Sequence, residues 1–92
     1  MNISETDVFQ KAEGVSFTDI PDGLAVNDTE GEAIHFLNPV ASTVFLLCDG
    51  THAASTIAAI LKEEFALKEA PIQDVLSCLA ELETESMIHK LA

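Results

Sequence analysis

Residues 37–50 read LNPVASTVFLLCDG, and this stretch contains the clearest structural signals in the sequence. Asn38 offers a side-chain oxygen to the unpaired N–H groups at a helix start, and Pro39 follows at the first helical position, where a missing N–H costs nothing. Apolar residues then recur at helical spacing, at Val40, Val44, Leu47 and Cys48. Gly50 is typical of the left-handed residue that ends a helix. The stretch therefore predicts a helix with a defined start and end.

Upstream of this helix, apolar and polar residues alternate in three short segments, which is typical of strands. Val15 and Phe17 share one face of the first segment, and residues 24–27 form the second. The third segment covers residues 33–37, and turn signatures at 20–23 and 27–31 separate the three. Short turns between strands predict a three-stranded antiparallel meander.

The third strand has two faces of unequal hydrophobicity. Ile34 and Phe36 share one face, and Ala33 and His35 share the other. Because large apolar side chains favour the interior, we expect Ile34 and Phe36 to face the core.

The ends of the chain carry weaker signals. Residues 1–14 lack a firm period, and Val8 and Phe9 are their only adjacent pair of bulky apolar residues. We expect a flexible N-terminal arm over residues 1–14 and a single domain over residues 15–92. Residues 87–89 are expected to form a short extended tail or the end of a helix.

Two further helices follow the first. The second is predicted over residues 54–65, and the third from Pro71 to Glu85. The third helix has an apolar face of five residues, Ile72, Val75, Leu76, Leu79 and Leu82. Three strands followed by three helices predict an α+β fold, because strands and helices are segregated along the chain.

Charge excludes several classes of partner. The 92 residues include 16 acidic residues and 4 lysines, with no arginine, and the formal net charge is −12. Such a chain repels nucleic acid and anionic membranes, and a basic partner is its natural complement. No apolar run approaches the ~20 residues of a membrane span. The first ten residues are polar and acidic, so no secretory signal is predicted and a cytoplasmic location is expected.

No group of residues in the sequence has the spacing of a catalytic or metal site. His35, His52 and His89 have no partner at zinc-ligand spacing, so no metal site is expected. Cys48 and Cys78 lie in apolar runs and are expected to be buried free thiols. We therefore expect neither an enzyme nor a cofactor.

One stretch and several later positions resemble the PqqD family. The resemblance rests on Leu37-Asn38-Pro39, on Ala41 and Val44, on residues 46–50, and on later apolar positions, namely Ile57, Leu61, Phe65, Val75, Leu76, Leu79, Leu82 and Ile88. It covers roughly residues 15–90. It implies a winged helix-turn-helix-like fold, with a three-stranded antiparallel sheet followed by three helices. The chain departs from the family pattern at Ala53 and Ser86, where members usually carry Ser or Thr and Gly, respectively.

The resemblance also implies a function. Family members are peptide chaperones, also called RiPP recognition elements, which bind the leader of a ribosomally made precursor peptide. They present it to a modifying enzyme such as a radical SAM protein, and lasso-type machinery is another expected partner. The leader adds a strand to the third strand and packs against the third helix. The peptide-binding residues implied here are Glu32, Ala33, Ile34, His35, Phe36, Leu37, Asp74, Leu76, Cys78 and Leu82.

Side chains must supply specificity in such binding, because an edge strand pairs with any extended peptide. Four acidic residues near these elements favour Lys or Arg on the leader beside its apolar residues, namely Glu32, Asp74, Glu81 and Glu85. Either flank of the third helix, Cys78 with Leu82 or Leu76 with Ala80, is a candidate groove wall.

Two alternatives remain at this point. A DNA-binding winged helix has a similar topology, but the charge argues against it. A structural or dimerisation domain would pair its free edge strand with a second copy, giving a homodimer.

Overall fold

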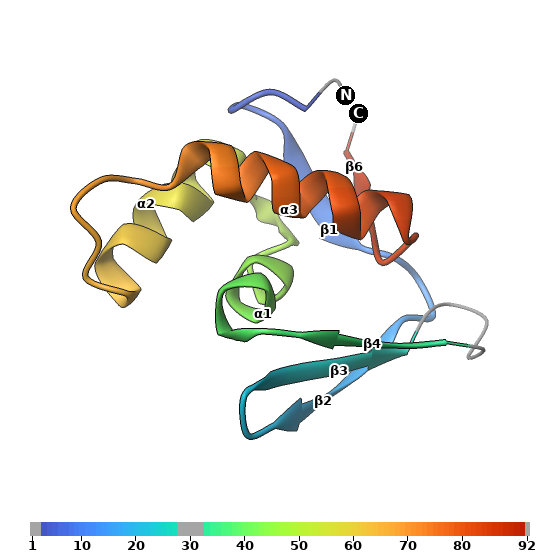
Figure 1. Cartoon of the computed structure of the whole chain (residues 1–92). Coiled ribbons are helices and arrows are strands. Elements are labelled where there is room, and N and C mark those ends of the chain that lie inside the picture. The colour runs from blue at the N-terminus through green and yellow to red at the C-terminus, as the bar shows by residue number, and fades with distance from the viewer. Residues whose placement is uncertain (1–2, 28–32, 92) are drawn as a thin grey trace.

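The computed structural model describes residues 3–27 and 33–91 and has mixed α+β architecture (Figure 1). In chain order the elements are β1 (Val8–Lys11), β2 (Ser16–Ile20), β3 (Gly23–Asn27), β4 (Ile34–Leu37), α1 (Pro39–Leu46), β5 (Asp49–Ala53), α2 (Ala54–Glu64), α3 (Ile72–Thr84) and β6 (Ile88–Lys90). The strands form two antiparallel sheets, ordered β2-β3-β4 and β5-β1-β6. The α+β prediction is confirmed. The predicted meander is the β2-β3-β4 sheet, whereas the other sheet was not expected.

Helix α1 begins where the sequence predicts, at Asn38 and Pro39. Asn38 Oδ1 accepts a hydrogen bond of 2.8 Å from the backbone N–H of Ala41, and Pro39 occupies the first turn of α1. The prediction that Gly50 ends this helix is wrong, because α1 ends at Leu46 and Leu47 is its C-cap. Gly50 instead lies within β5 with a φ of +85°.

Residues 8–11 form a strand, so the expectation of a flexible arm over residues 1–14 is wrong for this segment. β1 lies between β5 and β6, and its Phe9 is fully buried. Backbone pairing on both sides stabilises β1. Val8 pairs with Ala53 of β5, and Phe9 pairs with Lys90 of β6. The same sheet includes His52 in β5. The predicted extended tail corresponds to β6.

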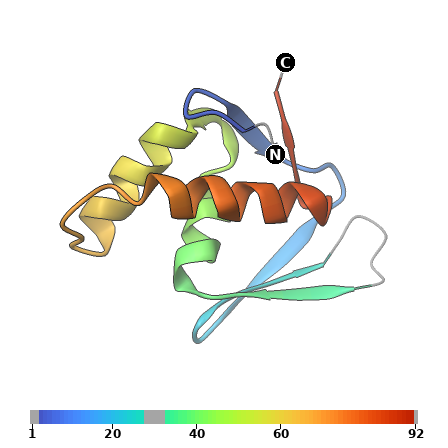
Figure 2. The ribbon, with the colours of Figure 1, turned by 45° about the horizontal axis from the view of Figure 1, so that its top comes forward.

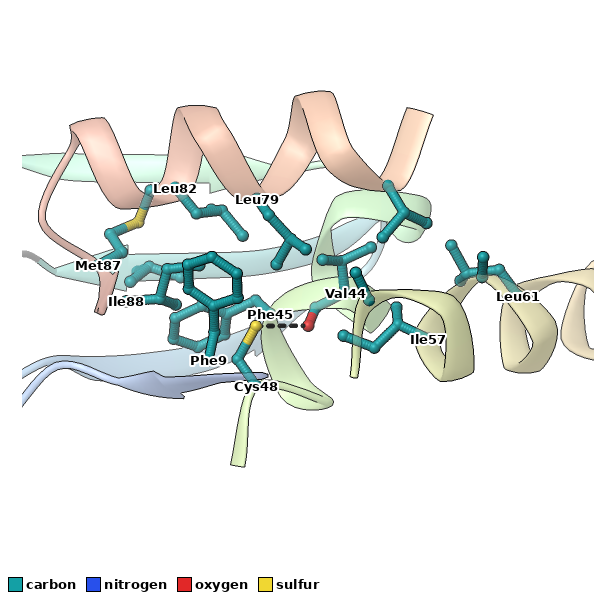
Figure 3. Packing of buried hydrophobic residues seen from close by; sticks show 14 of the residues in the cluster. Phe9, Val44, Phe45, Cys48, Ile57, Leu61, Leu79, Leu82, Met87 and Ile88 are labelled. Atoms are coloured by element: carbon teal, nitrogen blue, oxygen red, sulfur yellow. Dashed lines mark hydrogen bonds between the residues drawn. The ribbon is translucent and has the colours of Figure 1, made fainter. Parts of the chain in front are cut away.

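The hydrophobic core lies between the helices and the two sheets (Figures 1 and 2). Phe9 and Ile88 reach it from the β5-β1-β6 sheet, while Leu79 and Leu82 reach it from α3 (Figure 3). Cys48 Sγ donates to the carbonyl oxygen of Val44 over 3.2 Å. Both cysteines are free; Cys48 is buried and Cys78 is half-buried. The core thus joins the β5-β1-β6 sheet and α3 in one structure.

The orientation of β4 reverses the prediction for this strand. The side chains of Ile34 and Phe36 are 59% and 72% exposed, so their predicted core role is wrong. Register explains the difference, because directly paired residues of neighbouring strands point to the same face. His35 pairs with buried Val26, and Leu37 pairs with buried Leu24. His35 and Leu37 therefore point toward the helices, and Ile34 and Phe36 point outward.

Candidate functional site

A groove lies between β4 and α3, with a volume of about 380 Å³. All four residues of β4 line it, together with Ala41 of α1 and five residues in or just after α3. These five are Cys78, Glu81, Leu82, Glu85 and Met87. The two elements face each other across the groove, with the C-terminal end of α3 beside the start of β4 (Figures 1 and 2).

One long side of the groove is an open strand edge. β4 pairs with β3 on one side only, and no strand of the described residues pairs with its other side. The carbonyl oxygen of Leu37 points toward β3, because a Cβ built on Gly23 in β3 would collide with it. Backbone groups alternate in direction along a strand of an antiparallel pair. The N–H and C=O groups of Ile34 and Phe36 therefore point to the open edge.

The floor of the groove is apolar. Leu82 and Met87 are buried, and Leu37 and Cys78 are half-buried against the core cluster. Burial raises the pKa of the Cys78 thiol to about 11, with a smaller contribution from the nearby Glu81 carboxylate. At neutral pH this thiol is therefore protonated. It serves as part of an apolar wall and lacks the thiolate that a nucleophile needs.

One end of the groove is acidic. Glu81 lies in the last turn of α3 and Glu85 is its C-cap residue, and both side chains are exposed. The last turn contains no basic residue. The C-terminus of a helix also carries partial negative charge from its free carbonyl groups. No lysine lines the groove, so this end attracts cations.

The structure brings together six of the ten residues that the resemblance implied. They are Ile34, His35, Phe36, Leu37, Cys78 and Leu82. Glu81 and Glu85, expected only as charges, also line the groove, and the flank of α3 that faces it is the one with Cys78 and Leu82. Ala41 and Met87 were missed. Ala41 lies one helical turn after Asn38, which is the signal that could have placed it beside β4.

The other four implied residues lie elsewhere. Asp74 belongs to the opposite end of α3, where it lines a separate hollow with residues 69–73. Leu76 is half-buried against the core, and Ala33 is exposed just before β4. Glu32 and the turn predicted over 27–31 lie outside the described residues, except for Asn27 at the end of β3.

A second polar cluster lies at the start of β5. Asp49 Oδ1 accepts from the Thr51 hydroxyl over 2.6 Å and from the Thr51 N–H over 3.0 Å, and it lies 3.0 Å from His52 Nδ1. Chiefly the Thr51 hydroxyl lowers the pKa of the Asp49 carboxyl to about 2. Because these bonds are local and the cluster lines none of the hollows described above, it orders the strand start.

Two features are absent from residues 3–27 and 33–91, namely a metal-binding cluster and a membrane-spanning helix. Within them, no three His, Cys, Asp or Glu side chains converge in a way that would hold a metal ion. No helix in this part of the chain has the length and hydrophobicity needed to cross a bilayer.

The fold and the groove together define a class of protein. A small α+β domain with an open strand edge beside an apolar helix flank has the geometry of a peptide-binding module. The sequence model of the family described as coenzyme PQQ synthesis protein D (PqqD) matches residues 23–88. The chain therefore belongs to the PqqD family, an accessory family in the synthesis of this coenzyme. Searches of curated proteins and of solved structures gave no significant match.

Proposed function

We propose that this protein is a non-catalytic chaperone that binds the leader of a ribosomally synthesised precursor peptide by strand addition. It acts in the cytoplasm and presents the bound precursor to a modifying enzyme such as a radical SAM protein. The observation that carries this proposal is the open edge of β4, which borders the groove against α3. Family membership supports the same class of partner.

The backbone of β4 suits an extended peptide. Ile34 and Phe36 offer two N–H and two C=O groups at the open edge, and these four groups pair with a peptide of any sequence. Each such hydrogen bond contributes about 0.5–1.5 kcal/mol. The edge therefore supplies affinity without demanding a particular peptide side chain.

The apolar floor adds the rest of the binding free energy. Two peptide side chains buried against Leu37, Cys78 and Leu82 contribute about 1.5–3 kcal/mol each. Ordering a flexible leader costs about 2–5 kcal/mol or more. A micromolar Kd corresponds to a binding free energy of about 8 kcal/mol. The favourable contributions less the ordering cost therefore correspond at best to a micromolar or somewhat lower Kd. Such a complex forms readily and still releases the peptide to an enzyme.

The experiment is a titration of the ¹⁵N-labelled full chain with a synthetic peptide that matches the leader of the precursor encoded beside it. We expect the largest shifts in β4 and in the second half of α3, with small shifts in β5. If shifts are absent from β4 and α3 at saturating peptide, the proposal is wrong.

A pair of variants at one position tests the role of the strand edge. Phe36→Pro removes an N–H that points to the open edge, and a proline is tolerated in an edge strand at such a position. Phe36→Ala removes the same side chain and keeps the N–H. We expect Phe36→Pro to bind the leader about two- to tenfold more weakly than Phe36→Ala, with similar melting temperatures. Equal affinities for the two variants would contradict strand addition.

The same open edge suits a second copy of the chain, which is the dimerisation alternative. Light scattering separates the two functions. A dimer that persists on dilution, with β4 amides protected from hydrogen exchange in the absence of peptide, would favour the dimerisation domain.

A further inference from the structure

The groove has two chemically different ends. β4 leads into α1, so Leu37 and Ala41 lie at one end with Cys78 opposite. The C-terminal end of α3 lies beside the start of β4, which brings Glu85 to the other end (Figures 1 and 2). The seven residues from Cys78 to Glu85 advance about 10 Å along a helix, and the three from Leu37 back to Ile34 advance about the same along a strand. The apolar and acidic ends are therefore separated by the length of β4.

An added strand would place alternate side chains in this groove. Every second residue of the peptide points toward the helices, on the face that holds His35 and Leu37. Two such residues are separated by about 6.8 Å. The ends lie about 10 Å apart, so one side chain at the apolar end and the next inward side chain reach both ends when the second one is as long as Lys or Arg.

The groove acids are free to meet a cation. The ion pairs in the described residues join Asp49 to His52 and Asp7 to Lys90, so Glu81 and Glu85 take part in none of them. A Lys or Arg side chain at this end would meet both carboxylates and the negative end of α3.

The direction of the peptide sets the order of its residues. β4 runs from the acidic end to the apolar end, and its neighbour β3 is antiparallel to it. Antiparallel pairs outnumber parallel pairs roughly two- to threefold. A peptide antiparallel to β4 meets the apolar end first and the acidic end second.

We propose that the groove selects an extended peptide in which an apolar residue is followed two positions later by Lys or Arg. This inference rests on the proposed function, since it assumes strand addition to β4. It names the feature that distinguishes the peptide of this chain from other extended peptides.

Four nine-residue peptides with blocked ends test this pattern in the full chain. Each carries two probe residues at positions four and six among Ser and Thr: Leu then Lys, Lys then Leu, Leu then Gln, and Leu then Glu. We expect the peptide with Leu before Lys to bind at least about fivefold more tightly than each of the others, by amide shifts in β4. The advantage over the Gln peptide is expected to shrink as salt increases.

Matched double variants assign the preference to the groove. Glu81→Gln with Glu85→Gln removes two carboxylates from the groove, whereas Glu63→Gln with Glu83→Gln removes two exposed carboxylates that do not line it. The first variant is expected to bind the Lys and Gln peptides equally, and the second to keep the preference. A preference lost equally in both variants would overturn the inference and indicate a general effect of net charge.

The outcomes separate the two proposals. Equal binding of all four peptides, with shifts in β4, overturns the selectivity and leaves strand addition in place. Tighter binding of the peptide with Lys before Leu overturns the proposed order. Absence of β4 shifts with these four peptides overturns the selectivity if the leader peptide still shifts β4, and absence with the leader as well overturns both proposals.

Discussion

The ring of Phe17 in β2 meets the ring of Phe45 in α1 edge-on, with centroids 5.3 Å apart and planes inclined by 82°. Lys11 of β1 places its Nζ atom 5.3 Å from the centroid of the same Phe45 ring. Phe45 therefore contacts residues from both sheets. The contact also explains why Phe17, although 43% exposed, faces α1.

Phe17→Leu tests this aromatic contact. An edge-to-face pair contributes about 0.5–1.5 kcal/mol beyond the area that it buries. We expect urea unfolding to show a loss of this size in the free energy of unfolding. Phe36→Leu is the matched control, because Phe36 is 72% exposed and packs against no partner ring in the described residues. A loss of equal size in both variants would contradict a specific role for the pair.

Phe9→Ala tests whether β1 belongs to the folded core. Truncation of a buried Phe to Ala costs about 3–5 kcal/mol, and Phe9 is fully buried. We expect a correspondingly lower urea midpoint, whereas Gln10→Ala, at an exposed neighbouring position, should change it little. Similar midpoints for the two variants would restore the interpretation of residues 8–11 as a flexible arm.

Gly23→Ala tests the close approach of β3 and β4. Gly23 has a φ of +146°, and a Cβ built there would lie 1.8 Å from the Leu37 carbonyl oxygen. Backbone strain of this kind costs about 1–3 kcal/mol, to which the collision adds. Gly50→Ala is the control, because Gly50 has a φ of +85° but its nearest neighbour is the Gln10 side chain at 3.3 Å.

We expect thermal unfolding to rank Gly23→Ala as clearly less stable than Gly50→Ala. The collision also displaces Leu37, so the leader peptide should bind Gly23→Ala more weakly. Equal stability of the two variants would mean that strain alone, without the carbonyl contact, determines the cost.

Asp49→Asn tests the polar cluster at the start of β5. Hydrogen bonds lower the pKa of this carboxyl from its ordinary value of 3.8 to about 2. A lowered pKa means that the charged form stabilises the fold above about pH 4, and that this contribution is lost as the pH falls toward 2. We expect the native chain to be more stable than Asp49→Asn at pH 6, and the difference to vanish by about pH 2.

The measurement is the urea midpoint of the native chain and of Asp49→Asn between pH 2 and pH 6. Asp19→Asn makes the same change in charge at an exposed position of β2 and serves as the control. A stability difference for Asp49→Asn that is constant with pH would contradict the assignment of the lowered pKa to the folded state.

Local signals predicted much of the fold. The cap at Asn38 and the apolar spacing of α3 act within a few residues, so they are visible in the sequence. β1 and β5 are different, because VFQK and DGTHA carry no sustained alternation of apolar and polar residues. These strands form by pairing with segments far away in the chain, and a local sequence pattern cannot predict such pairing.

The sequence predicted only part of the candidate site, for a related reason. Alternation along β4 separates Ile34 and Phe36 from His35 and Leu37, but it does not say which pair faces inward. The register with Leu24 and Val26 decides this, and register is a property of two strands. Likewise, the sequence supplies Glu81 and Glu85 as charges, whereas the orientation of α3 places them at one end of the groove.

The pairing of β1 with β6 also bears on when the molecule becomes functional during its synthesis. Phe9 lies opposite Lys90, so β1 gains one of its two neighbouring strands only after β6 has been synthesised. Contacts between distant segments require closure of a long loop and slow the folding of a domain. The groove likewise needs α3, which is translated long after β4. We therefore expect this domain to capture peptides only after β6 has left the ribosome.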